Sequence, residues 1–276
     1  MIIDAHQHYW LLSRGDYDWL TSEAGKLFTD YMPNHLKPQL SNHGVARTIV
    51  VQSAPTLAET EFLLGLARKE PCIAGVVGWM NLLSGTFEED LSRLKADPLF
   101  VGIRPTFPRG EDGSLLFTER LDRSLQVLAD HDVPVDLLLS AHQLHDVIKL
   151  VTRAPTLRVV LNHIGNPTLQ LDDWEAWADA IAAIAEHPGS YCKLSCMITR
   201  VPEGMQANEV LYPYVRHVRQ CFGSERLLFG SDWPVCRLSG EYGDTAALLV
   251  RLLTDLTEEE RVSIYKKNAM RVYGLK

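Results

Sequence analysis

Two histidines one residue apart are the first residues of this chain that could do chemistry. They end the short apolar run Ile2-Ile3-Asp4-Ala5-His6-Gln7-His8. Residues i and i+2 of a β-strand point to the same face, so His6 and His8 project together. Two imidazoles at the end of a strand can bind a metal ion or polarise a carbonyl group. A His-x-His pair alone is weak evidence, because such histidines also occur in cores and on surfaces.

Further polar residues occur at the ends of other apolar runs. Each has an ordinary explanation: Lys193 could extend its amine to solvent, Arg104 could pair with a rim carboxylate, and Asp232 could belong to a turn. If the runs are strands whose carboxyl ends meet, these side chains form one site. We therefore expect a functional site that includes two cations, three imidazoles and one carboxylate, built from His6, His8, Trp79, Asn81, Arg104, Asn162, His163, Lys193, Ser195 and Asp232.

Eight segments have the length and composition of β-strands. Most are continuously apolar rather than alternating, which is typical of parallel strands that are covered on both faces. The predicted strands are Ile2–His8, Thr48–Ser53, Ile73–Met80, Phe100–Pro105, Val133–Ser140, Arg158–Ile164, Tyr191–Met197 and Leu227–Trp233.

Predicted helices lie between these strands. Leu121, Leu125 and Leu128 form one apolar stripe along a helix predicted at Thr118–Asp130. Thr257 and Glu260 have the spacing of a capping box at the start of a last helix that continues to Tyr265. The remaining predicted helices are Leu57–Lys69, Thr86–Lys95 and Asp172–Glu186.

This alternation of strands and helices predicts an α/β fold. Eight units in roughly 250 residues fit a closed (β/α)8 TIM barrel, with residues 1–276 as a single domain. An open doubly wound sheet is the alternative, but it calls for a glycine-rich phosphate turn after the first strand. The chain has His-Gln-His-Tyr-Trp at that position, so we favour the barrel.

A long connection, from Tyr9 to about Gly44, follows the first predicted strand. It contains several aromatic residues and prolines, and loops of this length in a compact domain are often lids or binding loops. An insertion packed on the rim of the barrel explains it equally well. The sequence leaves both interpretations open.

Composition narrows the class of partner. The 276 residues are 46% hydrophobic and 22% charged, and the formal net charge is −8, which argues against nucleic acid or an anionic membrane surface as the main partner. No apolar stretch approaches the roughly 18 residues of a transmembrane helix. Five scattered cysteines form no Cys-x-x-Cys pair, so we expect a reduced, cytoplasmic setting.

Three motifs resemble the amidohydrolase superfamily: Asp4-Ala5-His6-Gln7-His8-Tyr9-Trp10, Asn162-His163-Ile164-Gly165-Asn166-Pro167 and Gly230-Ser231-Asp232-Trp233-Pro234. The resemblance extends over essentially the whole chain. The aromatic pair after His8 and the Lys-x-Ser at Lys193 are similar to the branch of sugar-lactone hydrolases. This resemblance implies a hydrolase that opens a small-molecule sugar lactone, such as L-fuconolactone, in carbohydrate catabolism.

The metal pattern departs from that of binuclear members of the superfamily. The fourth predicted strand ends in Arg104, which has no lone pair for a metal, and the fifth carries no histidine. We therefore expect no pair of metal ions. His6, His8 and Asp232 could hold one divalent ion such as zinc. The branch resemblance implies that the reaction does not require this ion.

The expected mechanism is attack of an activated water on the lactone carbonyl. Asp232 is the expected general base, because a carboxylate flanked by cations stays ionised and can take a proton from water. Polarisation of the carbonyl and binding of the sugar hydroxyls are assigned jointly to His6, His8, Arg104, His163 and Lys193. Trp10, Trp79 and Trp233 are candidate walls of the sugar pocket, although core packing explains each nearly as well.

Other functions remain open at this stage. A dicarboxylate lactone would call for a second arginine at the site, and Arg109 and Arg200 are candidates away from the strands. A metal-dependent decarboxylase of the same superfamily would use the same barrel. A non-catalytic barrel protein is the third alternative. Neither the particular lactone nor the oligomeric state follows from the sequence.

Overall fold

A computed structural model describes residues 1–169 and 174–276. Eight parallel strands form one sheet in chain order. They are β1 Ile2–Gln7, β2 Val45–Val51, β3 Ile73–Gly78, β4 Phe100–Ile103, β5 Val135–Leu137, β6 Val159–Leu161, β7 Ser190–Leu194 and β8 Leu227–Phe229. Every predicted strand is present, but most are shorter than expected.

The sheet closes between its first strand and the residues that follow its last. Gln7 forms a parallel bridge to Trp233, and the His8 amide donates to the Trp233 carbonyl at 2.7 Å. The Asp232 amide donates to the His6 carbonyl at 2.8 Å. The predicted (β/α)8 barrel is thereby confirmed.

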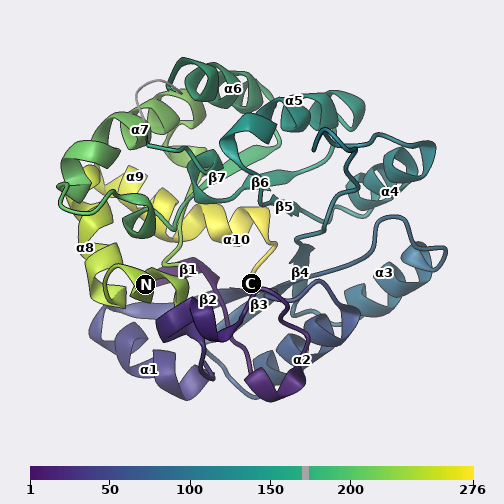
Figure 1. The fold of residues 1–276 in the computed structure, drawn as a ribbon, viewed down its shortest axis with the longest axis horizontal. Helices are drawn as coiled ribbons and strands as arrows, with labels where there is room; N and C mark the ends of the chain where they lie inside the picture. Colours follow the sequence, from purple (N-terminus) through teal and green to yellow (C-terminus); the bar gives the residue numbers. More distant parts are fainter. Residues whose placement is uncertain (170–173) are drawn as a thin grey trace.

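Helices surround the barrel (Figure 1). The first ones are α1 Pro33–Asn42, α2 Leu57–Ala67, α3 Phe87–Lys95, α4 Glu119–Asp130 and α5 Leu144–Arg153. They are followed by α6 Trp174–Glu186, α7 Ala207–Phe222, α8 Tyr242–Leu252, α9 Glu258–Val262 and α10 Asn268–Val272. No helix among the described residues is long and apolar enough to cross a membrane.

Side-chain caps are present at the start of several of these helices, and the one at α9 was predicted from the sequence. Thr118 caps α4 by accepting a hydrogen bond from the Leu121 amide at 3.2 Å. The capping box is present at α9, where Thr257 accepts from the Glu260 amide at 3.2 Å and the Glu260 carboxylate accepts from the Thr257 amide at 2.8 Å. A π-helical turn, Ser263–Lys267, then joins α9 to α10.

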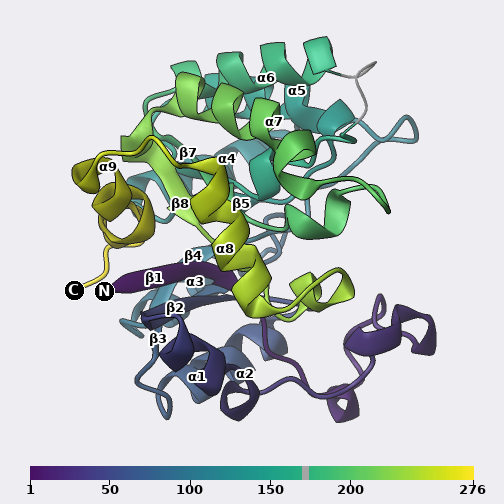
Figure 2. The same cartoon turned by 90° about the vertical axis from the view of Figure 1, so that its left-hand side faces the viewer.

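The core has two parts. Residues on the inner face of the strands, such as Ile49, Val160 and Leu228, pack inside the barrel together with Val272 and Tyr273 from the C-terminal end of the chain. A larger cluster fills the space between the strands and the surrounding helices. The chain ends lie together at one end of the barrel, and the connection after β1 lies at the opposite end (Figure 2).

The structure corrects the expectation of one long irregular connection. Pro33 occupies the first turn of α1, where its missing N–H costs nothing, and Leu36 and Leu40 are buried on the inner side of this helix. The irregular part therefore ends at Met32. The predicted helix Asp172–Glu186 is present from Trp174, and its first two residues lie outside the described part of the chain.

Candidate active site

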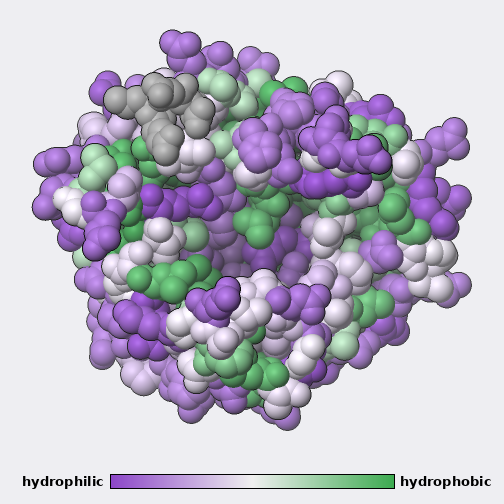
Figure 3. Space-filling model, in the orientation of Figure 1, coloured by the Kyte–Doolittle hydropathy of each residue, from purple (hydrophilic) through white to green (hydrophobic). Residues whose placement is uncertain are grey.

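A cavity of about 630 Å³ opens at the carboxyl ends of the strands. Figure 3 shows this face, hollowed at its centre, with hydrophilic residues inside the hollow. Four of the six predicted catalytic residues line the cavity: His8, Arg104, His163 and Asp232. Each lies just beyond the last residue of its strand, because β1, β4, β6 and β8 end before these polar positions. The fold therefore gathers residues that are far apart in the chain into one site.

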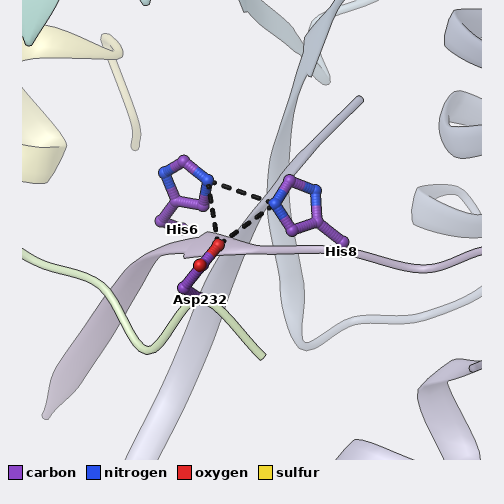
Figure 4. Close-up of side chains that lie close together, drawn as sticks. All are labelled: His6, His8 and Asp232. Atoms are coloured by element: carbon purple, nitrogen blue, oxygen red, sulfur yellow. Dashed lines mark hydrogen bonds and ion pairs between the residues drawn. The ribbon is translucent and has the colours of Figure 1, made fainter. Parts of the chain in front are cut away.

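His6, His8 and Asp232 form a compact triad (Figure 4). Their atoms lie 3.2 Å apart for the two Nε2 atoms, 3.3 Å for His8 Nε2 and Asp232 Oδ1, and 3.5 Å for His6 Nε2 and Asp232 Oδ1. Ligands of a tetrahedral zinc ion, at about 2.0–2.2 Å from the metal, lie roughly 3.3–3.6 Å from one another. The triad therefore has the right size to hold one ion.

Strand β2 fixes the orientation of His8. The Nδ1 atom of His8 lies 2.7 Å from the Val51 carbonyl, and 3.3 Å from Ser53 Oγ. A carbonyl oxygen only accepts hydrogen bonds, so Nδ1 carries the proton and the lone pair of a neutral His8 is on Nε2. Burial lowers the pKa of His8, which favours this neutral form.

Asp232 adopts a left-handed backbone conformation, with φ of 58°. Buried Asp4 supports this turn, because its carboxylate accepts from the Ser231 amide at 2.9 Å and from the Ser231 hydroxyl at 2.6 Å. His163 and Cys196, which follow β6 and β7, also have positive φ. Strained backbone of this kind persists where the surrounding structure holds it, and it often occurs at functional sites.

The Asp232 carboxylate is ionised although it is almost completely buried. Burial alone would raise its pKa, but interactions with His163 and His8 outweigh that effect and leave the pKa at about 2. A buried, ionised carboxylate beside a cavity can accept a proton from a bound water.

His163 presents a neutral imidazole to the same cavity. Burial lowers the pKa of His163 to about 3, and its Nδ1 atom lies 2.8 Å from the Ser195 hydroxyl. A neutral imidazole keeps one N–H donor that can stabilise negative charge on an oxygen. His163, Cys196 and Asp232 form a second group of close ligand atoms, and sequence reasoning did not single out Cys196.

Arg104 contributes a buried guanidinium. It donates to the Gln52 carbonyl, and its Nε atom has no hydrogen-bond partner. Within the described residues, no carboxylate lies within 4 Å of this guanidinium. The cation is thus held by backbone contacts and remains available to an oxygen in the cavity.

Lys193 and His6 lie deeper than the other predicted residues. Lys193 is completely buried, its ammonium pairs with Asp136 on β5, and it does not line the cavity. Burial lowers the pKa of Lys193, while the Asp136 carboxylate acts in the opposite direction. Lys193 therefore lies in the barrel interior beneath the cavity, where it contacts His6 and does not reach the cavity itself.

The three predicted tryptophans have different surroundings. Trp10 lines the cavity, whereas Trp233 packs edge-on against Tyr9 and Tyr31, and Trp79 donates to Thr106. Trp19, which was not predicted, also lines the cavity and is fixed by a hydrogen bond to the Ser53 carbonyl at 2.8 Å. Trp19 is one of the aromatic residues of the long connection after β1. The aromatic content of that connection was the sequence feature that could have identified it as a wall of the cavity.

The model of the family described as "Amidohydrolase" matches residues 3–275. The chain belongs to the amidohydrolase family. An L-fucono-1,5-lactonase of Burkholderia ambifaria is 37% identical over 250 residues, which cover 90% of this chain and 85% of the relative. An L-fucono-1,5-lactonase of Burkholderia multivorans is 33% identical over 99% of this chain and 96% of the relative. The resemblance to the sugar-lactonase branch is confirmed by these relatives.

A solved structure gives the same result for the fold. The crystal structure of an amidohydrolase from Burkholderia multivorans with bound zinc has a TM-score of 0.90, 31% sequence identity and complete coverage of both chains. That relative was crystallised with bound zinc, and the triad of this chain has the dimensions to hold one ion.

Proposed function

We propose that this protein hydrolyses a sugar lactone, such as L-fuconolactone. The observation that carries the proposal is a single ionised carboxylate, Asp232, beside a cavity that also presents neutral His163 and the Arg104 cation. Two relatives that are 33% and 37% identical over most of the chain and are named L-fucono-1,5-lactonases support the choice of substrate class. The five free thiols are compatible with a reducing compartment such as the cytoplasm.

In the proposed reaction, Asp232 accepts a proton from a water that attacks the lactone carbonyl carbon. The carbonyl oxygen becomes an oxyanion, which the Arg104 guanidinium and the N–H of His163 stabilise. Collapse of this intermediate breaks the bond between the carbonyl carbon and the ring oxygen. The proton held by Asp232 then passes to the ring oxygen, which gives the open-chain hydroxy acid.

A divalent ion bound to His6, His8 and Asp232 would supply Lewis-acid chemistry to the carbonyl or lower the pKa of a bound water. His8 is oriented as a typical ligand, since its other nitrogen donates to a backbone carbonyl. His6 is not, because its other nitrogen faces the Lys193 ammonium. We therefore propose that the reaction does not require the ion.

The lactone of a dicarboxylic acid, which carries a free carboxylate, is the other candidate substrate. Arg109 and Arg200, the two arginines that such a substrate would call for, both line the cavity. Arg200 donates to Asn166 and has a buried Nε atom without a partner, while Arg109 lies 3.7 Å from Asp146. Arg109 is thus already paired, and the unpartnered Nε atom of Arg200 is the feature that favours an acidic substrate.

The test is acid release from a panel of neutral aldonolactones and lactones of sugar dicarboxylic acids, with protein shown to be metal-free by elemental analysis. Rapid hydrolysis of neutral lactones by metal-free protein supports the proposal. Exclusive hydrolysis of the acidic lactones would replace the substrate class. Activity that appears only after zinc or manganese is added would contradict the metal-independent mechanism, and no lactone hydrolysis under either condition would contradict the proposed function.

A further inference from the structure

The triad of His6, His8 and Asp232 requires one hydrogen or one cation between its members. His8 presents a lone pair on Nε2, because its Nδ1–H donates to Val51. That lone pair lies 3.3 Å from a carboxylate oxygen of Asp232 and 3.2 Å from His6 Nε2. Two acceptors at this distance repel each other unless a hydrogen or a metal lies between them. Whether His6 Nε2 carries a proton therefore decides whether a hydrogen or a metal ion lies between the three side chains.

Lys193 contacts the other nitrogen of His6. The distance from Lys193 Nζ to His6 Nδ1 is 3.4 Å, and both side chains are fully buried. An ammonium has three donors and no lone pair, so Nδ1 of His6 must be the acceptor in this contact. A neutral imidazole with an accepting Nδ1 carries its proton on Nε2, where it can serve His8 and Asp232.

A second layer of contacts keeps the Lys193 ammonium in place. Asp136 pairs with Lys193, and the same carboxylate accepts from Asn162 at 3.0 Å and from the Tyr273 hydroxyl at 2.7 Å. The ring of Tyr273 also lies 5.4 Å from the ammonium. These three groups come from β5, from the residue after β6 and from the residue after α10, so Lys193 has little freedom to turn away from His6.

We propose that Lys193 is a positioning residue, which holds His6 with its proton on Nε2 and thereby satisfies the triad without a metal ion. A histidine that binds zinc through Nε2 must carry its proton on Nδ1, and here that proton would point at an ammonium. Lys193 thus selects the metal-free form of the site. The inference deepens the proposed function, on which its catalytic meaning rests, but its tests require no substrate.

Nitrogen NMR of the wild-type protein tests the tautomer directly. In metal-free protein labelled with ¹⁵N-histidine, the His6 signals are assigned by their loss in His6→Asn. We expect a proton on Nε2 and none on Nδ1 of His6, and the opposite pattern on His8. A proton on Nδ1 of His6, or a doubly protonated His8 that supplies the shared hydrogen, would overturn the proposal.

Zinc affinity tests the consequence. The double variant Lys193→Met/Asp136→Asn removes one positive and one negative charge, so it alters the hydrogen bond to His6 without changing the net charge of the site. We expect it to bind zinc at least ~10-fold more tightly than wild type in competition with a chelating indicator, since partners of a histidine ligand typically change metal affinity 10–100-fold.

Tyr273→Phe is the matched control for this measurement, because it disturbs the same buried network but leaves the Lys193 ammonium facing His6. It should bind zinc within ~3-fold of wild type. Equal zinc affinity in the double variant and wild type, or an equal gain in Tyr273→Phe, would contradict the positioning role. If the double variant fails to fold, the NMR result on wild-type protein decides the question. Lactonase activity enters neither test, so a failed function and a failed inference are distinguishable.

Discussion

At the scale of single residues, the main feature is a carboxylate that stays ionised where burial opposes charge. Asp232 is 2% exposed, yet its pKa is about 2. Burial by itself disfavours the charged form, and the interactions with the neighbouring His163 and His8 act in the opposite direction. A base with this pKa is deprotonated at neutral pH.

Asp232→Asn should lower kcat for lactone hydrolysis by about 10²–10⁴-fold, because an amide cannot take the proton of the attacking water. Initial rates of acid release by variant and wild type give the measurement. Asp179→Asn, on the exposed side of α6, is the control and should leave the rate unchanged. A kcat of Asp232→Asn within threefold of wild type would show that another group is the base.

Gly230 allows β8 to approach the triad closely. A Cβ at this position would lie 2.7 Å from His6 Cβ and 3.0 Å from Ser195 Cβ. Gly230→Ala should therefore cost about 1–3 kcal/mol of unfolding free energy and reduce lactonase activity by displacing His6. Urea denaturation and initial rates provide the two measurements.

Gly65 in α2 is the matched control for this substitution. Nothing lies within 4 Å of a Cβ at that position, so Gly65→Ala should stabilise the protein by about 0.5–1 kcal/mol and leave activity unchanged. If Gly230→Ala behaved in the same way, close packing at the end of β8 would not be what positions His6.

At the scale of elements, Glu59 of α2 anchors the connection that follows β1. Tyr17 donates to its carboxylate at 2.9 Å, the Ser53 amide donates at 3.2 Å, and Arg14 lies 3.5 Å away. Burial raises the pKa of Glu59 to about 7, although these contacts act in the opposite direction. The anchor thus changes charge near neutral pH.

The sign of the resulting pH dependence follows from this shift. Between pH of about 4.5 and about 7, folded Glu59 binds more protons than unfolded Glu59, so its contribution lowers the free energy of unfolding as pH rises. The full effect is on the order of 3 kcal/mol. Glu59→Gln should remove this part of the slope in urea denaturation measured from pH 4.5 to 8. An unchanged slope in Glu59→Gln would mean that Glu59 ionises equally in both states.

Sequence patterns predicted the type and order of the strands better than their ends. Apolar runs do not show where strand geometry stops, and the predicted ranges continued into Arg104 and Asp232, which belong to loops. Helices α1, α5, α7, α8 and α10 were not among the predicted ones. In α1 and α7, Pro38 and Pro213 argue locally against a helix. Burial of Leu36 and Leu211 outweighs that local preference.

The sequence predicted which residues belong to the site, but not how deeply each of them is buried. Alternation along a strand indicates that Lys193 and Ser195 share a face, yet it does not say which of them reaches the cavity. Lys193 lies one residue before the end of β7, with Asp136 beside it, and therefore sits under His6. Asp136 was read only as part of an apolar strand, because its partners come from β7 and from Tyr273 near the C-terminal end.

At the scale of the whole molecule, the C-terminal segment fills one end of the barrel. Tyr273 is 3% exposed and packs with Ile49 and Val160 on the inner face of the strands. Tyr273→Ala should lower the free energy of unfolding by about 3–5 kcal/mol, since it leaves a cavity and removes a donor to Asp136. Urea denaturation measures this loss.

Tyr212→Ala is the control at this scale. Tyr212 lies on α7 and is 50% exposed, so its truncation should change stability by no more than about 0.5 kcal/mol. An equal loss of unfolding free energy in the two variants would show that packing of the C-terminal segment inside the barrel does not stabilise the protein.

Closure of the barrel has a consequence for the synthesis of the chain. The hydrogen bond from the Ser231 amide to Asp4 joins residues 227 positions apart, at the seam where β1 meets the residues after β8. Until β8 has left the ribosome, β1 and β7 both present unpaired strand edges, which are prone to aggregation. His6 and His8 are therefore synthesised early, whereas Asp232, the carboxylate of their triad, is added only late in translation. We therefore expect lactonase activity only in chains that include β8 and Asp232. Nascent or truncated chains that lack them should depend on chaperones and show no activity.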